Sequence, residues 1–193
     1  MTSSARHTSR ASVATGSSGR FADGARIVGV DPGLNITGYG AVEVQGGKAT
    51  LLEAGVLRPG SSKKPIERRL LELYDGLSEA LTEIRPVAIA IEQLYSHYEL
   101  PRTAILMGHA RGVICLAAAK HDVPVFSYAP AQIKKTLTGG GRADKAQMQR
   151  AIAREFGLAQ PPEPADVADA LAIALCHFFL GGPGANEELD DDK

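Results

Sequence analysis

The chain has 193 residues, of which 44% are apolar and 22% charged, so it suits one domain with a substantial core and is not wholly disordered. Its formal net charge of -1 is unusual for a protein that binds nucleic acid, but the charge is unevenly distributed. Residues 1–26 contain four Arg and one Asp, and residues 185–193 contain five acids and one Lys, which leaves residues 27–184 formally neutral. Binding to nucleic acid would therefore require the positive charge of this middle part to gather in a patch.

Both ends of the chain have low sequence complexity. We expect residues 1–26 and 185–193 to be disordered extensions of one domain over residues 27–184. The two cysteines, Cys115 and Cys176, lie far apart and lack the spacing of a zinc site, which predicts reduced, buried thiols. No apolar run is long enough to span a membrane, and no secretory signal is recognisable. These features predict a cytoplasmic protein that has no contact with membranes.

The first predicted elements form an antiparallel meander. Residues 26–31 are a short apolar run closed by Asp-Pro-Gly, which predicts a buried strand that ends at Asp31. Residues 36–45 and 49–57 are predicted to form two further strands, because each is rich in strand-forming residues and a Gly-Gly pair between them favours a hairpin turn.

The apolar period then changes to steps of three and four residues over 66–84, which predicts an amphipathic helix that Pro86 ends. The next segment, 87–92, is continuously apolar, as is typical of a strand covered on both faces. The remaining predicted elements are helices at 102–121, 131–137, 144–156 and 166–180, and a strand at 123–127. This order predicts an α/β fold, in which a mixed sheet has helices on both faces.

Four acidic residues lie at the ends of these predicted elements. Asp31 and Glu92 each close an apolar strand, at the sheet edge where the sites of α/β proteins form. Asp166 and Asp169 are one turn apart at the start of a helix that is apolar nearly all round. Structural interpretations stay open for each: a turn-forming Asp-Pro-Gly, an ion pair for Glu92, and a helix cap followed by a first-turn acid.

Considered together, the four acids favour a metal site. Carboxylates brought together repel one another unless divalent cations bind between them. Hard oxygen ligands without Cys or an obligatory His favour Mg²⁺, with Mn²⁺ as a substitute, over zinc. A carboxylate-held pair of such ions is suited to phosphodiester hydrolysis. We therefore predict a nuclease-type site with one or two Mg²⁺.

Two other segments have the composition of nucleic-acid contacts. Lys134, Lys135, Arg142 and Lys145 surround three consecutive glycines, which predicts a phosphate cradle, although a solvated linker fits the same pattern. Tyr95 follows Glu92 closely and could either stack on an unpaired base or anchor its loop. A further basic group is interpreted mainly as solvated surface: Lys63, Lys64, Arg68 and Arg69.

Four segments of the chain, VGVDPGLNITGYG, AIEQLYS, MGHARGV and ADVADALAIALCH, resemble in order and spacing the signature segments of the RuvC family of Holliday junction resolvases. The resemblance covers residues 27–177. It implies an RNase H-like fold with a five-stranded mixed sheet whose first three strands are antiparallel. The implied activity is structure-specific: paired, symmetric nicking of opposing strands in four-way junction DNA during recombination and repair, which leaves 5′-phosphate and 3′-hydroxyl ends.

The resemblance also implies roles for single residues. Asp31, Glu92, Asp166 and Asp169 match the catalytic, metal-binding acids of the family. Lys145 matches a lysine close to the scissile phosphate, Lys134 matches a DNA-contacting lysine, and Tyr95 matches an aromatic position that stacks on a junction base.

The implied assembly is a homodimer, together with a branch-migration helicase complex of the RuvA–RuvB type. The family's dimer interface uses the helix that contains MGHARGV, where the small residues Gly108, Ala110 and Gly112 would permit close helix approach. The long Arg-rich N-terminus and the acidic C-terminus depart from the family pattern, and the resemblance implies no role for them.

Three other functions fit parts of the pattern. Actin-like ATPases and sugar kinases also begin with an Asp-Gly-rich strand turn, but they need a second nucleotide-binding half for which 193 residues leave no room. The presence of all four acids disfavours a non-catalytic module that binds branched DNA. Another nuclease of the RNase H superfamily, acting on RNA or an RNA–DNA hybrid, is the main alternative, because the acids alone do not specify the substrate.

Overall fold

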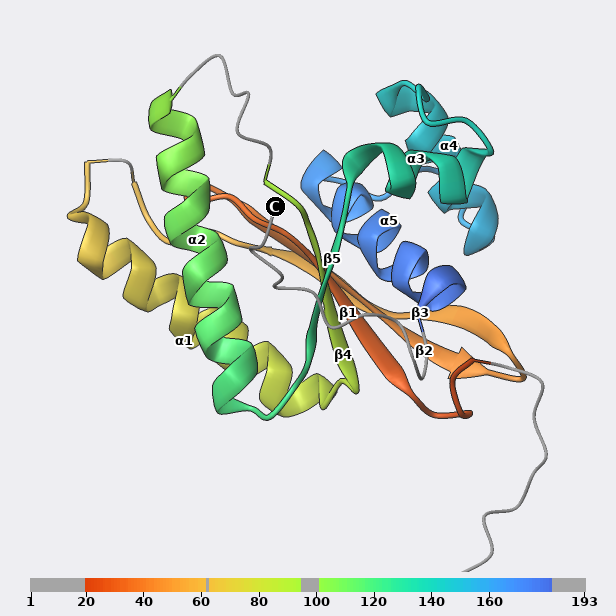
Figure 1. The fold of residues 1–193 in the computed structure, drawn as a ribbon, viewed down its shortest axis with the longest axis horizontal. Helices are drawn as coiled ribbons and strands as arrows, with labels where there is room; N and C mark the ends of the chain where they lie inside the picture. Colours follow the sequence, from red (N-terminus) through yellow and green to blue (C-terminus); the bar gives the residue numbers. More distant parts are fainter. Residues whose placement is uncertain (1–19, 62, 95–100, 182–193) are drawn as a thin grey trace, which may run out of the picture.

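Five strands form one mixed sheet at the centre of the molecule (Figure 1). The computed structural model describes residues 20–61, 63–94 and 101–181. Its strands are β1 (Arg26–Asp31), β2 (Thr37–Gln45), β3 (Lys48–Leu57), β4 (Ala88–Glu92) and β5 (Val125–Tyr128), in the spatial order β3-β2-β1-β4-β5. The first three are antiparallel, and β4 and β5 continue the sheet in parallel with β1. The predicted α/β fold and strand directions are confirmed.

Helices cover both faces of this sheet (Figure 1). On one face lie α1 (Ile66–Ile84) and α2 (Pro101–Lys120), and on the other lies α5 (Ala165–Leu180) with α3 (Pro130–Thr138) and α4 (Lys145–Glu155). Successive side chains of a strand point to opposite faces, so Val28 and Val30 join the core under α1 and α2, whereas Ile27 joins the core under α5. None of the helices in the described part of the chain has both the length and the apolar character needed to cross a bilayer.

The hairpin between β2 and β3 has the predicted turn. Gly46 and Gly47 have φ values of 58° and 75°, which suit a two-residue turn whose central residues both need positive φ. At the N-terminal end of this meander, ordered structure begins before residue 27, where the domain was expected to start. The backbone N–H of Val44 donates to the carbonyl of Ala25 at 2.8 Å, and Phe21 packs against the core beside Phe178.

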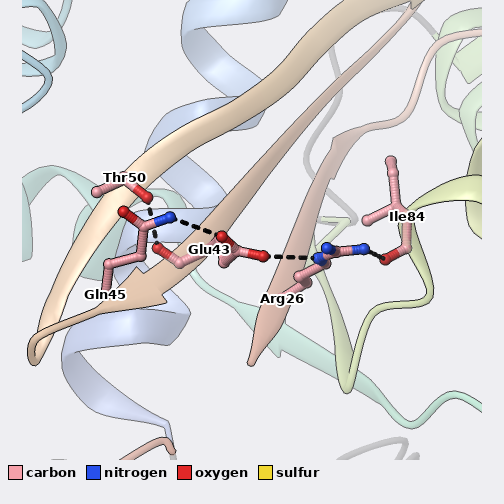
Figure 2. Close-up of polar contacts among 5 residues, drawn as sticks. All are labelled: Arg26, Glu43, Gln45, Thr50 and Ile84. Atoms are coloured by element: carbon pink, nitrogen blue, oxygen red, sulfur yellow. Dashed lines mark hydrogen bonds and ion pairs between the residues drawn. The ribbon is translucent and has the colours of Figure 1, made fainter. Parts of the chain in front are cut away.

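Polar contacts fasten the N-terminal end of β1 (Figure 2). Arg26 donates from Nε to Glu43 Oε1 at 2.9 Å and from Nη1 to the carbonyl oxygen of Ile84 at 3.0 Å. Thr50 Oγ1 donates to the Glu43 carbonyl oxygen at 2.9 Å, and Gln45 Nε2 donates to Glu43 Oε2 at 2.7 Å. Arg26 thereby connects β1 with both β2 and the last residue of α1.

The last strand begins two residues later than predicted and ends one residue later. Val123 belongs to the exit from α2, because its N–H donates to the Ala118 carbonyl oxygen at 3.0 Å and the preceding Asp122 has a positive φ of 55°. Pro124 has no N–H to donate, although its carbonyl oxygen accepts from Ile89 at 2.9 Å. Regular pairing therefore starts only at Val125.

Candidate active site

The C-terminal ends of β1 and β4 lie next to each other. Val30 pairs with Ile91 in parallel register, so the residues that follow them, Asp31 and Glu92, end neighbouring strands. On its other side, Asp31 pairs with Gly38 of β2. The register therefore brings two of the four predicted acids to one edge of the sheet.

Glycines allow α5 to lie directly on this part of the sheet. A Cβ atom at Gly38 would come within 2.1 Å of the Asp166 carbonyl oxygen, and one at Gly29 would meet the α5 backbone equally closely. Only a residue without a side chain permits such an approach. Because Gly38 pairs with Asp31, the contact sets the first turn of α5, with Asp166 and Asp169, beside the end of β1.

The four carboxyl groups act on one another electrostatically. The pKa of Asp31 is raised from 3.8 to about 7, first by burial and then by the charges of Asp169, Glu92 and Asp166. Burial, followed by the charge of Asp169, also raises the pKa of Glu92. Neighbouring like charges have this effect only at short range. The acids of β1, β4 and α5 therefore gather around Asp31.

Two lysines offset part of this negative charge. The Nζ atom of Lys145, the first residue of α4, lies 3.3 Å from Asp169 Oδ2, and its charge lowers the pKa of Asp31 against the effect of the acids. Lys134 of α3 similarly opposes the rise in the pKa of Glu92. Both lysines line a cleft of about 270 Å³ together with Glu92 and Asp169.

The start of α4 is held by a reciprocal cap, which orients Lys145. Asp144 Oδ1 accepts from the Gln147 backbone N–H at 2.7 Å, and Gln147 Oε1 accepts from the Asp144 N–H at 2.8 Å. Such capping boxes satisfy two backbone donors that the helix leaves free. Lys145 therefore projects toward the acids from a fixed backbone position.

The donor set suits a hard divalent cation, although it is not a finished cage. Within the described residues, no group of three or more His, Cys, Asp or Glu side chains is arranged so that it could hold a metal ion as it stands. Four carboxylates and two lysines leave an excess of negative charge, which pushes the acids apart and which a divalent cation would neutralise. Carboxylate oxygens are the ligands that Mg²⁺ and Mn²⁺ prefer. The chemistry of the residues fits such an ion.

Arg111 of α2, which was not predicted to take part in the site, supports its framework. Its Nη1 donates to the Glu92 carbonyl oxygen at 2.7 Å, and its Nη2 donates to Ser127 Oγ at 2.7 Å. It thus ties the end of β4 to β5 at the acidic residue itself. The only signal in the sequence was an arginine within the small-residue segment MGHARGV.

Arg69 supports the loop that follows Asp31, and its prediction as solvated surface is wrong. The residue is only 4% exposed, and Nη2 donates to the Leu34 carbonyl oxygen at 2.7 Å and to Asn35 Oδ1 at 2.8 Å. Its position four residues before Leu73 puts it on the buried stripe of α1. The helical period was therefore the signal that could have identified it.

Two of the other predicted nucleic-acid contacts, Lys135 and Arg142, do not line the acidic cleft. Lys135 is exposed and does not line the cleft, and Arg142 lines a different one, formed by α3, the glycine loop and α4. Tyr95 lies outside the described residues. The basic segment 134–145 therefore divides between two clefts.

The helix expected at a dimer interface exposes only part of its small-residue segment. Gly108 and Gly112 of α2 are exposed, and a Cβ atom at either would meet open space. Ala110 is 0% exposed and packs with Leu34 and Leu73, so the prediction that it permits helix approach between subunits is wrong. A helix that covers the sheet must turn some small residues inward.

Comparison with known proteins gives consistent matches over this domain. The sequence model of a family described as "Crossover junction endodeoxyribonuclease RuvC" matches residues 27–177. The protein of that description from Rhodopirellula baltica is 51% identical over 164 residues, which cover 85% of this chain and 89% of the relative. The corresponding protein from Ruminiclostridium cellulolyticum is 44% identical over 78% of this chain and 90% of its own length.

A solved structure is similar over the same region. The T. thermophilus protein described as "RuvC in complex with Holliday junction substrate" superposes with a TM-score of 0.76 at 36% identity. The match covers 80% of this chain and 93% of that one. Both the sequence and the arrangement of elements are therefore shared with this relative.

Proposed function

This chain belongs to the RuvC family of crossover junction endodeoxyribonucleases, and on that premise we propose that its substrate is a four-way (Holliday) junction in DNA. In this proposal it nicks two opposing strands symmetrically and leaves 5′-phosphate and 3′-hydroxyl ends. The gathering of four carboxyl groups around Asp31 is the observation that carries the catalytic part of the proposal. The T. thermophilus relative that was solved with a Holliday junction supports the choice of substrate.

We assign metal binding to Asp31, Glu92, Asp166 and Asp169, with one or two Mg²⁺, or Mn²⁺ in its place. Bound ions of this kind supply an activated water and stabilise the leaving oxygen of phosphodiester hydrolysis. The chain itself supplies the negative charge that attracts the ions and the rigid strand ends that hold the acids in place. Asp31 must lose its proton to act as a ligand, and its pKa of about 7 puts that step near neutral pH.

Lys145 is proposed to act on the scissile phosphate. Its ammonium group already neutralises part of the acidic cluster, since Nζ lies 3.3 Å from Asp169 Oδ2. A phosphate entering the cleft would offer it a second anionic partner, and the lysine would then stabilise the negative charge that develops on the phosphate oxygens. Lys134 lines the same cleft and is proposed to contact the DNA there. Lys135 and Tyr95 remain proposed DNA contacts.

We further propose that the protein acts as a homodimer through α2. Ile105 and Leu116 are 61% and 52% exposed, and the exposed Gly108 and Gly112 lie between them on the helix. An apolar, close-approach surface of this kind suits a second copy of the same helix. Two-fold symmetry would present two identical sites to opposing strands of the junction. A cytoplasmic location is proposed from the sequence features given above, and association with a branch-migration helicase complex is proposed from the family alone.

The test compares a four-way junction, a linear duplex and an RNA–DNA hybrid, each with and without Mg²⁺. We expect the protein to cut only the junction, in paired nicks and only with Mg²⁺. Asp31→Asn should lower the cleavage rate on the order of 10²–10³-fold or more while junction binding is retained. Comparable cutting of the hybrid would instead favour the RNA-directed alternative. If Asp31→Asn cut the junction at the wild-type rate, Asp31 would have no catalytic role.

A further inference from the structure

A second cleft, larger than the acidic one, opens on a different face of α4. It has a volume of about 600 Å³ and lies between the end of α3, the glycine loop and α4. Three of its lining residues are arginines, Arg142 from the loop and Arg150 and Arg154 from α4, and none of its described lining residues is acidic. We call this the arginine cleft.

None of the three guanidinium groups forms an ion pair with an acidic side chain among the described residues. Their guanidinium nitrogens also form no hydrogen bond with another described residue, and all three side chains are exposed. Three like charges on one concave surface repel one another, so an anion that enters the cleft relieves this repulsion.

The chemistry of the cleft suits the phosphate groups of the proposed DNA substrate. Guanidinium groups present planar forks of N–H donors that match phosphate oxygens in pairs. The arginine cleft offers three such forks from two segments, the loop and the helix, so that a tetrahedral anion could be held from more than one side.

The two clefts are linked by α4 itself. Lys145 at the start of the helix lines the acidic cleft, and Arg154, nine residues further on, lines the arginine cleft. At about 1.5 Å per residue these positions are roughly 13 Å apart along the helix. B-form DNA rises about 3.4 Å per nucleotide along its axis, so this separation spans at most roughly four nucleotides of one strand.

We propose that the arginine cleft binds a backbone phosphate of the DNA strand within about four nucleotides of the phosphate that is cut. The position along the strand rests on the proposed function, because Lys145 is taken to mark the scissile phosphate. Arg150 and Arg154 are DNA-binding residues in this proposal, joining Arg142, and their contact is independent of base sequence. The cleft thereby holds the arm of the junction in register with the acidic site.

The test measures binding in the Asp31→Asn background, so that the DNA stays intact. The double substitution Arg150→Gln/Arg154→Gln should raise the Kd for a junction roughly tenfold or more at fixed salt. It should also reduce the magnitude of the slope of log K against log salt concentration by about 1–2. The matched control, Arg85→Gln/Lys120→Gln, removes two exposed cations from the opposite end of the sheet and should change neither quantity appreciably. All four side chains are exposed, so both double variants should fold.

A second measurement locates the phosphate. Single phosphates within six nucleotides of the cut are replaced one at a time by neutral methylphosphonates. We expect a replacement at one position within about four nucleotides of the cut to weaken binding of the parent protein. The same replacement should have little further effect on Arg150→Gln/Arg154→Gln, because the two changes remove the same contact. The proposal would be overturned if the losses of binding from phosphate replacement and from the arginine-cleft substitutions were additive at every position. It would also be overturned if the arginine-cleft and control variants lost binding equally. Failure of the proposed function would give a different result, namely equal binding of junction and linear duplex. The arginine-cleft and control variants can be compared on either DNA, so the two failures are distinguishable.

Discussion

Asp31 changes charge near neutral pH, because its pKa in the folded protein is about 7 whereas an unfolded Asp titrates near 4. Between these two values the folded state holds a proton that the unfolded chain has lost. The free energy of unfolding therefore falls as the pH rises through this window, and it stays lowered above it. The acidic cluster thus weakens the metal-free fold at the pH at which the enzyme is proposed to act.

Asp31→Asn should consequently stabilise the metal-free protein. The amide has nearly the same shape as the carboxyl group but carries no charge, so it avoids both desolvation of a charge and repulsion by the other acids. At pH 8 in EDTA we expect calorimetry to show a Tm several degrees above that of the wild type, since about 1 kcal/mol corresponds to roughly 2–4 °C in a domain of this size. At pH 4 the two proteins should unfold at similar temperatures. A Tm at pH 8 equal to or below that of the wild type would contradict the strain assigned to Asp31.

The same titration predicts how cleavage depends on pH. A protonated Asp31 cannot serve as a ligand, so at limiting Mg²⁺ the rate should fall about tenfold per pH unit below about 7. Cation and proton compete for one group, and a higher Mg²⁺ concentration should therefore move the midpoint to lower pH. Single-turnover cleavage of a junction at several Mg²⁺ concentrations measures this shift. A midpoint that does not move with Mg²⁺ would exclude Asp31 as a ligand.

Among the elements, the contact between β2 and α5 has the greatest influence on the acidic site. Gly38→Ala would put a Cβ atom 2.1 Å from the Asp166 carbonyl oxygen, a backbone atom that cannot move without the first turn of α5. Displacement of a catalytic group by about 1 Å can lower a rate on the order of 10²-fold. We expect a loss of this size in single-turnover cleavage at saturating Mg²⁺, together with weaker binding of Mg²⁺.

Gly40→Ala is the matched control for this prediction. It also adds a methyl group between β2 and α5, but the nearest atoms, at 2.6–2.7 Å, belong to the buried Leu171 side chain, and the nearest backbone atom, Leu171 N, is 3.1 Å away. The clash therefore falls mainly on a core side chain more than one turn beyond Asp166 rather than on the backbone of the first turn. Gly40→Ala should therefore lower the Tm through poorer core packing and retain most of the cleavage rate. Equal rate losses in the two variants would show that general loosening of α5, rather than displacement of its first turn, causes the effect.

Local patterns in the sequence predicted the elements and the acids, and contacts between elements account for what was missed. Asp31 and Glu92 were identifiable because each closes an apolar run, and parallel neighbours end at one edge of a sheet. The role of Gly38 depends on how closely α5 approaches β2, which no local pattern encodes. Arg69 was misassigned because its basic neighbours suggested solvent, whereas its helical position faces the loop after Asp31.

At the scale of the whole molecule, charge is segregated although the domain between the chain ends is formally neutral. The acids gather at the ends of β1, β4 and α5, while the unpaired arginines lie on the far side of α4. This arrangement meets the requirement that the composition imposes on a DNA-binding protein, because a neutral total can still attract a polyanion through a local basic surface. It also keeps the basic surface within one helix length of the acids.

Paired cutting requires two copies of the acidic site, so the oligomeric state should decide the product. Leu116→Lys would place a charge on the exposed apolar face of α2, where a second α2 is proposed to pack. Ile105→Lys would do the same nearer the start of the helix. Both side chains face solvent in the single chain, so the fold should persist while the dimer dissociates, as sedimentation velocity at micromolar concentration can show. A monomer holds one site and should release singly nicked junctions instead of two linear duplexes.

Leu52→Lys, on a 40% exposed position of β3, introduces the same charge away from α2 and should stay dimeric with paired nicks. If Leu116→Lys stayed dimeric and made normal paired cuts, the dimer interface would have to lie on a surface other than α2.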